Sequence, residues 1–163
     1  MTADTLARKT CTPCEGHVAP LPPEKITELA AGVPAWAVVG GKRLRREWKV
    51  KDFVAGLEFF RRVGELAEAE GHHPDLHLTE YKHVAVELWT HAAGGLTEND
   101  FILAAKIDRV AYLLESEFGI ILPKDMQREF GPIANDEVDK LGREVSGDVS
   151  GLLFLKARDI SVH

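Results

Sequence analysis

The fold is decided by residues 68–101, which read EAEGHHPDLHLTEYKHVAVELWTHAAGGLTENDF. Gly71 is placed to end a helix, because glycine readily adopts the left-handed conformation that stops one. From Lys82 to His91 apolar and polar residues alternate, which is the period of a strand with one face in the core. Thr97 and Asp100 then have the spacing of a capping box at the start of another helix. The stretch therefore predicts the end of one helix, a strand and the start of a second helix.

The residues before this stretch predict a short helix, a hairpin and a longer helix. Residues 21–24, LPPE, are typical of a helix start, and Gly40-Gly41 between the apolar segments 35–39 and 44–50 predicts a tight antiparallel turn. Asp52 can cap the longer helix, whose apolar residues recur at helical spacing. That stripe consists of Phe53, Leu57, Phe60, Gly64 and Ala67, widened by Val63 and Leu66. The pattern predicts an α+β domain with helices on one face of an antiparallel sheet.

The second strand of the hairpin is rich in basic residues. Lys42, Arg43, Arg45 and Arg46 lie on it or beside it, and we interpret them as a solvated, edge-protecting strand face. The alternative is a contact with an anion or a partner. The helix that follows Asp100 carries apolar residues at helical spacing, which are Leu103, Ile107, Val110 and Leu114.

The composition is that of a globular protein with one ordinary domain. The 163 residues carry a net charge of −6, which argues against broad nucleic-acid affinity, and no apolar run is long enough to cross a bilayer. The start of the chain lacks the apolar core of a secretory signal. We therefore expect a cytoplasmic protein, or one in an organelle such as the chloroplast stroma if a leader was removed.

Cys11 and Cys14 have the spacing of a metal or redox pair, with His17 nearby. Two thiolates and one imidazole leave a zinc site one ligand short, and no strand–helix pattern surrounds them. A reduced, partly ordered amino-terminal arm is the preferred interpretation. We expect an arm over residues 1–20, a domain over 21–117 and an extension of unknown role over 118–163. That extension contains a weak helical pattern near 138–145 and an apolar patch at 152–155.

Three imidazoles and two carboxylates lie within a short span of the sequence, namely Glu68, His72, His73, His91 and Asp100. Such groups can move protons near neutral pH without a metal, because histidine titrates there and a carboxylate can orient it. Proline 74 keeps His73 extended, and adjacent residues of an extended segment point in opposite directions. His72 and His73 are therefore expected to have different tasks.

The spacing resembles the signature of the pterin-4a-carbinolamine dehydratases. The matching residues are Glu68, His72, His73, Pro74, Tyr81, His91 and Asp100. The resemblance also takes in Trp36, the segment 48–53 and Gly95-Leu96-Thr97, and it covers roughly residues 21–115. His77 and His83 match no position of this signature, so we expect them to be surface or structural residues.

The resemblance implies a substrate, a reaction and a set of roles. The substrate would be 4a-hydroxytetrahydrobiopterin, which loses water to give quinonoid dihydropterin, with no cofactor and no metal. His72 and His91 would form the acid/base pair, Asp100 and Glu68 would orient imidazoles, and His73, Pro74 and Glu68 would contact the pterin. The family also implies a fourth strand and association into homodimers or homotetramers. An aromatic amino-acid hydroxylase would be a functional partner, and neither nucleic acid nor membrane is expected.

Two alternatives remain open from the sequence. A zinc site formed by His72, His73 and His91 has a suitable ligand count, although divergent neighbouring histidines argue against it. A protein-binding role is the second, because the same fold is known in a transcriptional coactivator and in relatives that assist the assembly of Rubisco.

Overall fold

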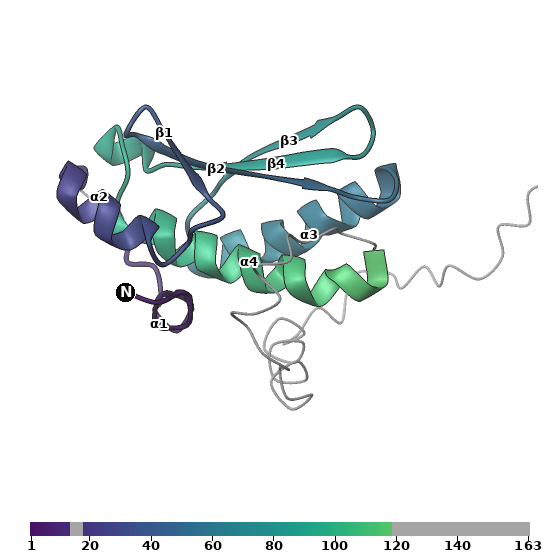
Figure 1. The fold of residues 1–163 in the computed structure, drawn as a ribbon, viewed down its shortest axis with the longest axis horizontal. Coiled ribbons are helices and arrows are strands. Elements are labelled where there is room, and N and C mark those ends of the chain that lie inside the picture. Colours follow the sequence, from purple (N-terminus) through teal and green to yellow (C-terminus); the bar gives the residue numbers. More distant parts are fainter. Residues whose placement is uncertain (14–17, 119–163) are drawn as a thin grey trace, which may run out of the picture. The chain divides into compact units, whose positions relative to one another are not determined.

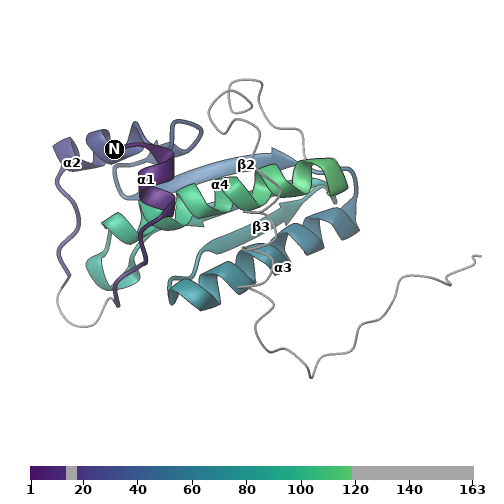
Figure 2. The ribbon, with the colours of Figure 1, turned by 90° about the horizontal axis from the view of Figure 1, so that it is seen from below.

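The computed structural model describes residues 1–13 and 18–118, so Cys14, His17 and the patterns near 138–145 and 152–155 lie outside the described residues. In the described part, one antiparallel sheet is covered on one face by two long helices (Figures 1 and 2). The elements in chain order are α1 (Ala3–Ala7), α2 (Pro23–Ala30), β1 (Ala37–Val39), β2 (Arg43–Lys49), α3 (Phe53–Glu70), β3 (Asp75–Thr79), β4 (His83–Leu88), the 3-10 turn η1 (His91–Ala93) and α4 (Glu98–Phe118). The strand order β1–β2–β4–β3 confirms the α+β class and the four-stranded antiparallel sheet.

β1 and β2 form the predicted hairpin. Gly40 and Gly41 have φ values of 59° and 66°, a region that glycine enters without steric cost. Val39 pairs with Arg43, and the N–H of Lys42 donates to the carbonyl of Val39 at 3.1 Å. The turn chemistry of the two glycines therefore sets the register of the first two strands.

β3 and β4 form a second hairpin, which supplies the fourth strand that the family resemblance implied. Its turn places Glu80 and Tyr81 at φ values of 47° and 56°, so two residues with side chains occupy the left-handed region. Non-glycine residues adopt this conformation only uncommonly. The hairpin consequently has no glycine signal in the sequence.

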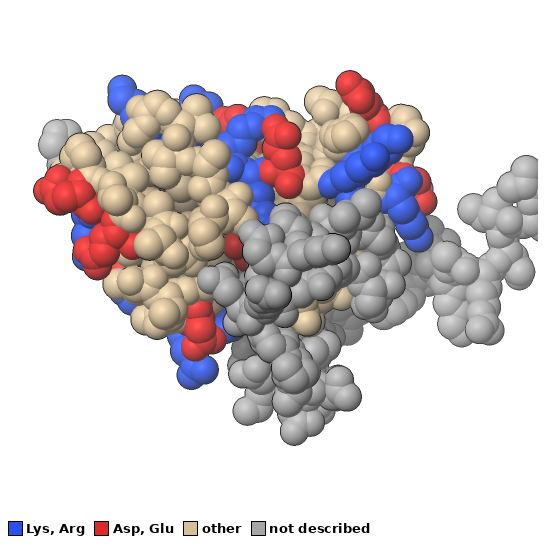
Figure 3. Space-filling model, in the orientation of Figure 1, with Lys and Arg blue, Asp and Glu red and all other residues tan. Residues whose placement is uncertain are grey.

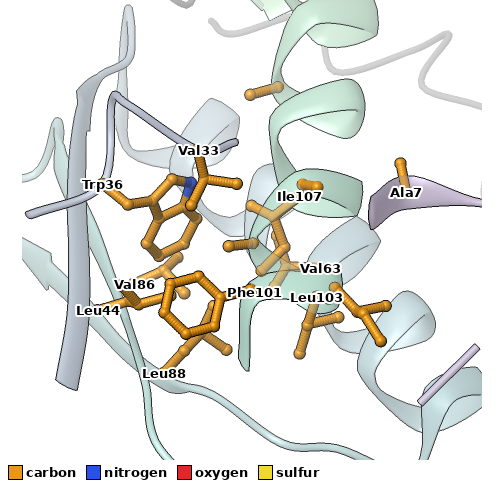
Figure 4. Packing of buried hydrophobic residues seen from close by; sticks show 14 of the residues in the cluster. Ala7, Val33, Trp36, Leu44, Val63, Val86, Leu88, Phe101, Leu103 and Ile107 are labelled. Atoms are coloured by element: carbon orange, nitrogen blue, oxygen red, sulfur yellow. The ribbon is translucent and has the colours of Figure 1, made fainter. Parts of the chain in front are cut away.

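The core lies between the helix-facing side of the sheet and α3 and α4 (Figure 4). Leu44 of β2 and Val86 and Leu88 of β4 pack in one cluster with Phe101 and Ile107 of α4, and all five are fully buried. Each such side chain stabilises the fold by about 1.5–3 kcal/mol relative to exposure. The alternation predicted for β4 and the helical stripe predicted for α4 are confirmed.

The apolar stripe predicted for α3 is partly wrong. Phe53 and Leu57 are about half exposed, at 50% and 48%, whereas Phe59 and Val63 are completely buried. Apolar residues occupy more than one face of this helix, so their period fits several stripes and packing against the sheet selects one. The predicted N-cap is confirmed, because the carboxylate of Asp52 accepts the N–H of Ala55 at 2.8 Å.

The solvated face predicted for the basic residues of β2 is wrong for Arg46. Strand alternation turns this residue toward the helices, where its side chain is 2% exposed and forms an ion pair with Asp108 of α4. The indole N–H of Trp36 donates to the same carboxylate at 2.8 Å. Arg43 and Arg45 do lie on the other face of the sheet, and both pair with Glu87. Arg46 thus joins the sheet to α4 instead of facing solvent.

The amino-terminal arm is more ordered than its sequence indicates. α1 packs against α4, Cys11 and Thr12 contact Asn99 of α4, and the side chain of Leu6 is fully buried. Ala7, which is labelled in Figure 4, and Cys11 are each 8% exposed and belong to the same hydrophobic cluster. The arm therefore contributes to the core of the domain.

Candidate active site

His72 lies where α3 gives way to β3. Gly71 adopts the left-handed conformation at the end of α3, with φ 62° and ψ 27°, and the N–H of His72 donates to the carbonyl of Ala67 at 3.2 Å. The chain is thereby turned so that the imidazole of His72 faces α4. Its Nε2 lies 2.7 Å from Oδ1 of Asp100, and the two side chains are 8% and 0% exposed.

Asp100 is held at the first turn of α4 by a cluster of donors. Its Oδ2 accepts the backbone N–H of Thr97 at 2.7 Å and the hydroxyl of Thr90 at 2.9 Å. The first of these bonds is the carboxylate half of the predicted capping box. The hydroxyls of Thr90 and Thr97 lie 2.7 Å apart. Both oxygens of the buried carboxylate are therefore paired, which keeps it oriented toward His72.

This geometry defines the roles of the two ring nitrogens of His72. An ionised carboxylate only accepts, so Nε2 donates to Asp100. In the described part of the chain, Nδ1 of His72 makes no hydrogen bond. If it were also shielded from solvent it would be a buried, unpartnered polar atom, but among the described residues only Nε1 of Trp48 is such an atom. Nδ1 of His72 therefore reaches the surface. It can accept or donate a proton there while Asp100 fixes the other nitrogen.

His73 points away from His72, as predicted. Its side chain is 63% exposed, and its Nε2 lies 2.8 Å from Oε1 of Glu68, which is one turn back on α3. The structure thus joins four of the five sequence-predicted groups into two separate pairs, His72 with Asp100 and His73 with Glu68, and leaves His91 outside both. Separating this exposed pair around a ligand would cost little stability, because surface ion pairs contribute little.

His91 begins η1, just after β4, and its side chain is exposed. The ring stacks on the indole of Trp89, with centroids 3.9 Å apart and an angle of 26° between the planes. The indole N–H donates to Asp75 at 3.1 Å. His91 directly follows Thr90, whose hydroxyl donates a hydrogen bond to Asp100. The sequence therefore links His91 to the residues that hold Asp100.

Sequence reasoning missed the parts played by Thr90 and Trp89. The segment Trp89-Thr90-His91 contained the available signal, because a threonine and an aromatic residue flank a site histidine. Trp89 stacks on the ring of His91, a contact that no local pattern predicts. The contact of Thr90 with a residue ten positions away could not be inferred without the fold.

The described residues contain no group of three or more histidine, cysteine or acidic side chains that could hold a metal ion. None of the described helices has the length and apolarity to span a bilayer. On the face drawn in Figure 3, basic side chains lie beside acidic ones. The charges visible on that face are thus mixed in sign.

A model of the family described as pterin 4 alpha carbinolamine dehydratase matches residues 19–110, which is more than half of the chain. The chain therefore belongs to the pterin 4 alpha carbinolamine dehydratase family. The match includes every residue of the two pairs and His91, whereas residues 1–13 lie outside it.

Individual relatives agree with this assignment. The chain is 47% identical over 109 residues to pterin-4-alpha-carbinolamine dehydratase 2, mitochondrial, of Arabidopsis thaliana, a match that covers 64% of this chain and 58% of the plant protein. It is 45% identical over 112 residues to a Methylococcus capsulatus protein named "Putative pterin-4-alpha-carbinolamine dehydratase". That match covers 68% of this chain and 97% of the Methylococcus protein. A crystal structure from Brucella melitensis, described as a transcriptional coactivator/pterin dehydratase, aligns with a TM-score of 0.51 at 30% identity. That alignment covers 56% of this chain and 97% of the Brucella chain.

Proposed function

We propose that this protein is a 4a-hydroxytetrahydrobiopterin dehydratase, a hydro-lyase that removes water from a pterin-4a-carbinolamine. The observation that carries the proposal is the buried pair of His72 and Asp100, whose carboxylate also accepts from Thr90, the residue directly before His91. Family membership supports the substrate class. The relatives' names support the reaction.

The reaction needs one proton donor and one proton acceptor. The bond between C4a and the hydroxyl oxygen breaks, and a protonated imidazole supplies the proton with which the hydroxyl leaves as water. The ring nitrogen next to C4a provides the electron pair for the new C=N bond, and a second imidazole takes up the proton released from the pterin. Such general acid–base catalysis contributes about 10²–10⁴-fold in rate.

We assign these two tasks to His72 and His91 and orientation of His72 to Asp100. His73, Pro74 and Glu68 are proposed to contact the pterin, which fits the exposure of His73 and Glu68 at the end of α3. The substrate nitrogen supplies the electron pair, so the proposal invokes no cofactor and no metal. An aromatic amino-acid hydroxylase is the proposed source of the carbinolamine.

The proposal is tested by following carbinolamine decay in a stopped-flow spectrometer. The wild-type chain should accelerate decay over the buffer rate, and His72→Ala and His91→Ala should each lose at least about 10²-fold in kcat. His83→Ala is the matched control, because this histidine lies on β4 but is 46% exposed outside the site. Full turnover in both site variants would reject the assignment.

A second candidate, binding of a protein partner, is supported by a different observation. Phe53, Val54 and Leu57 at the start of α3 are 50%, 70% and 48% exposed, so an apolar surface is available on that helix. Rubisco is the partner proposed for this role, and association into homodimers or homotetramers stays a prediction. Light scattering of the purified protein and a pull-down with and without Val54→Glu would test it. A monomer that recovers no partner would count against this role. The cytoplasmic or organellar location also stays a prediction.

A further inference from the structure

The arm that precedes the family match contacts both segments that bring the site pair together. The N–H of Cys11 donates to Oε2 of Glu70 at 2.8 Å, and Glu70 lies two residues before His72. One residue later, the N–H of Thr12 donates to Oδ1 of Asn99 at 3.0 Å. Asn99 directly precedes Asp100 in the sequence.

The contact between Thr12 and Asn99 fixes the amide of Asn99 at two points. Its oxygen accepts from the backbone of Thr12, and its nitrogen donates to the carbonyl of the same residue at 2.7 Å. Asn99 is 5% exposed, and each of these two hydrogen bonds contributes about 0.5–1.5 kcal/mol. The arm is thereby bound tightly to the first turn of α4.

The contact at Glu70 fixes the end of α3 in a similar way. Glu70 accepts from Cys11 and also pairs with Lys106 of α4. Burial alone would raise the pKa of this carboxyl, but the hydrogen bonds from Lys106 and the Cys11 N–H outweigh it and lower the pKa. The charged form of Glu70 is thus favoured where it links the arm, α3 and α4.

We propose that the amino-terminal arm is a positioning element for the catalytic pair, with Cys11 and Thr12 bridging the end of α3 and the start of α4. His72 follows α3 and Asp100 lies in α4, so their 2.7 Å contact depends on how the end of α3 is held against the start of α4. A third segment that bonds to the residues beside both partners limits their relative movement. The geometric part of this inference stands alone, while its effect on turnover rests on the proposed function.

The test uses variants of the full chain that break the bridge from each side. Asn99→Ala removes the amide from α4, and Thr12→Pro removes the backbone donor from the arm without altering α4. Arg8→Ala is the matched control, because Arg8 is 72% exposed and pairs with Asp4 inside the arm. The first readout is the rate at which the Nε2 proton of His72 exchanges with water, measured by NMR. The second is the separation of kcat from KM.

The inference predicts that both bridge variants exchange the ring proton about tenfold faster or more, while Arg8→Ala matches the wild type. In the dehydration assay kcat should fall on the order of tenfold, with KM changed less than twofold, because misplacement of a catalytic group lowers the rate of the chemical step. The double variant should lose no more than either single variant. Additive losses, or unchanged ring-proton exchange in both folded variants, would overturn the inference.

Two further outcomes keep the tests separate. If the wild-type chain shows no dehydratase activity, the proposed function fails, and the ring-proton exchange still decides the positioning role. If the bridge variants do not fold, native-state exchange of the wild type in low urea replaces them. The Thr12 amide proton and the His72 ring proton should then exchange through one opening event with the same free energy. A Thr12 amide that exchanges freely while the ring proton stays protected would contradict the role of the arm.

Discussion

Replacing Asp100 by asparagine keeps the shape of the side chain and changes what it offers to His72. The backbone N–H of Thr97 can only donate, so the remaining oxygen of the amide must stay at the position of Oδ2. The new NH₂ group then faces Nε2 of His72, which must accept instead of donate. Asp100→Asn therefore forces the proton of His72 onto Nδ1, the nitrogen that reaches the surface.

The size of the effect follows from the bonds that change. If Nδ1 of neutral His72 carries a proton, it can no longer accept one, and we expect kcat to fall by roughly 10²–10⁴-fold. The stability cost of Asp100→Asn should be only about 1–2 kcal/mol, because the bonds persist without charge assistance. Asp100→Ala should cost about 2–6 kcal/mol, since it leaves the N–H of Thr97 and the ring N–H of His72 without an acceptor.

Three measurements check this prediction together. Urea unfolding gives the two stability changes, stopped-flow decay of the carbinolamine gives kcat, and ¹⁵N NMR of the histidine rings shows which nitrogen of His72 is protonated. The reasoning would be refuted by an Asp100→Asn variant with wild-type turnover. A His72 proton that stays on Nε2 in this variant would refute it equally.

Three further predictions concern other contacts. Asp108→Ala should destabilise the fold by about 3–5 kcal/mol in urea unfolding, because it removes one member of the buried ion pair with Arg46, whereas a loss below 1 kcal/mol would contradict the pairing. Burial and the nearby acidic groups raise the pKa of the Cys11 thiol from 9.0 to about 12, so its alkylation below pH 9, read by peptide mapping, should be about a thousandfold slower than that of a free thiol. Because the folded state keeps the Cys11 proton more strongly than the unfolded state does, the raised pKa contributes stability that is fully present below pH 9 and declines from pH 9 to 12. Alkylation of Cys11 at the free-thiol rate would contradict the raised pKa. Trp89→Leu should lower kcat/KM roughly two- to tenfold, because the ring of His91 loses its stacking partner, and unchanged kinetics would show that the stack has no role.

Much of the fold followed from local signals in the sequence. The glycine pair at residues 40–41, the N-cap at Asp52 and the helix end at Gly71 each act through the backbone within a few residues, and all three are confirmed. The capping box at Thr97 and Asp100 belongs to the same class. Such signals are readable because their physical cause does not depend on distant parts of the chain.

The features that could not be predicted depend on contacts that are remote in sequence. Arg46 was predicted as one of a set of solvated basic residues, whereas it is buried in an ion pair with Asp108, 62 positions later. The side chain of Phe59 was buried in place of those of Phe53 and Leu57 because the sheet selects the face of α3. The β3–β4 turn lacked a glycine signal because Glu80 and Tyr81 occupy the left-handed conformation themselves.

In the candidate site, too, features set by the local backbone could be predicted and contacts remote in sequence could not. Divergence of His72 and His73 was predicted from the extended backbone before a proline, and their exposures of 8% and 63% confirm it. The family resemblance implied that Asp100 and Glu68 orient imidazoles. The contact of Asp100 with Thr90 had no sequence signal, because it joins the end of β4 to the start of α4 through the fold.

The most direct test of the central claim is a crystal structure with 7,8-dihydrobiopterin bound. The account predicts that the pterin ring lies against His72, His73 and His91, with Nδ1 of His72 toward the ring and Nε2 still bonded to Asp100. A pterin bound on another surface, or one that contacts His73 alone while His72 and His91 face away from it, would contradict the account.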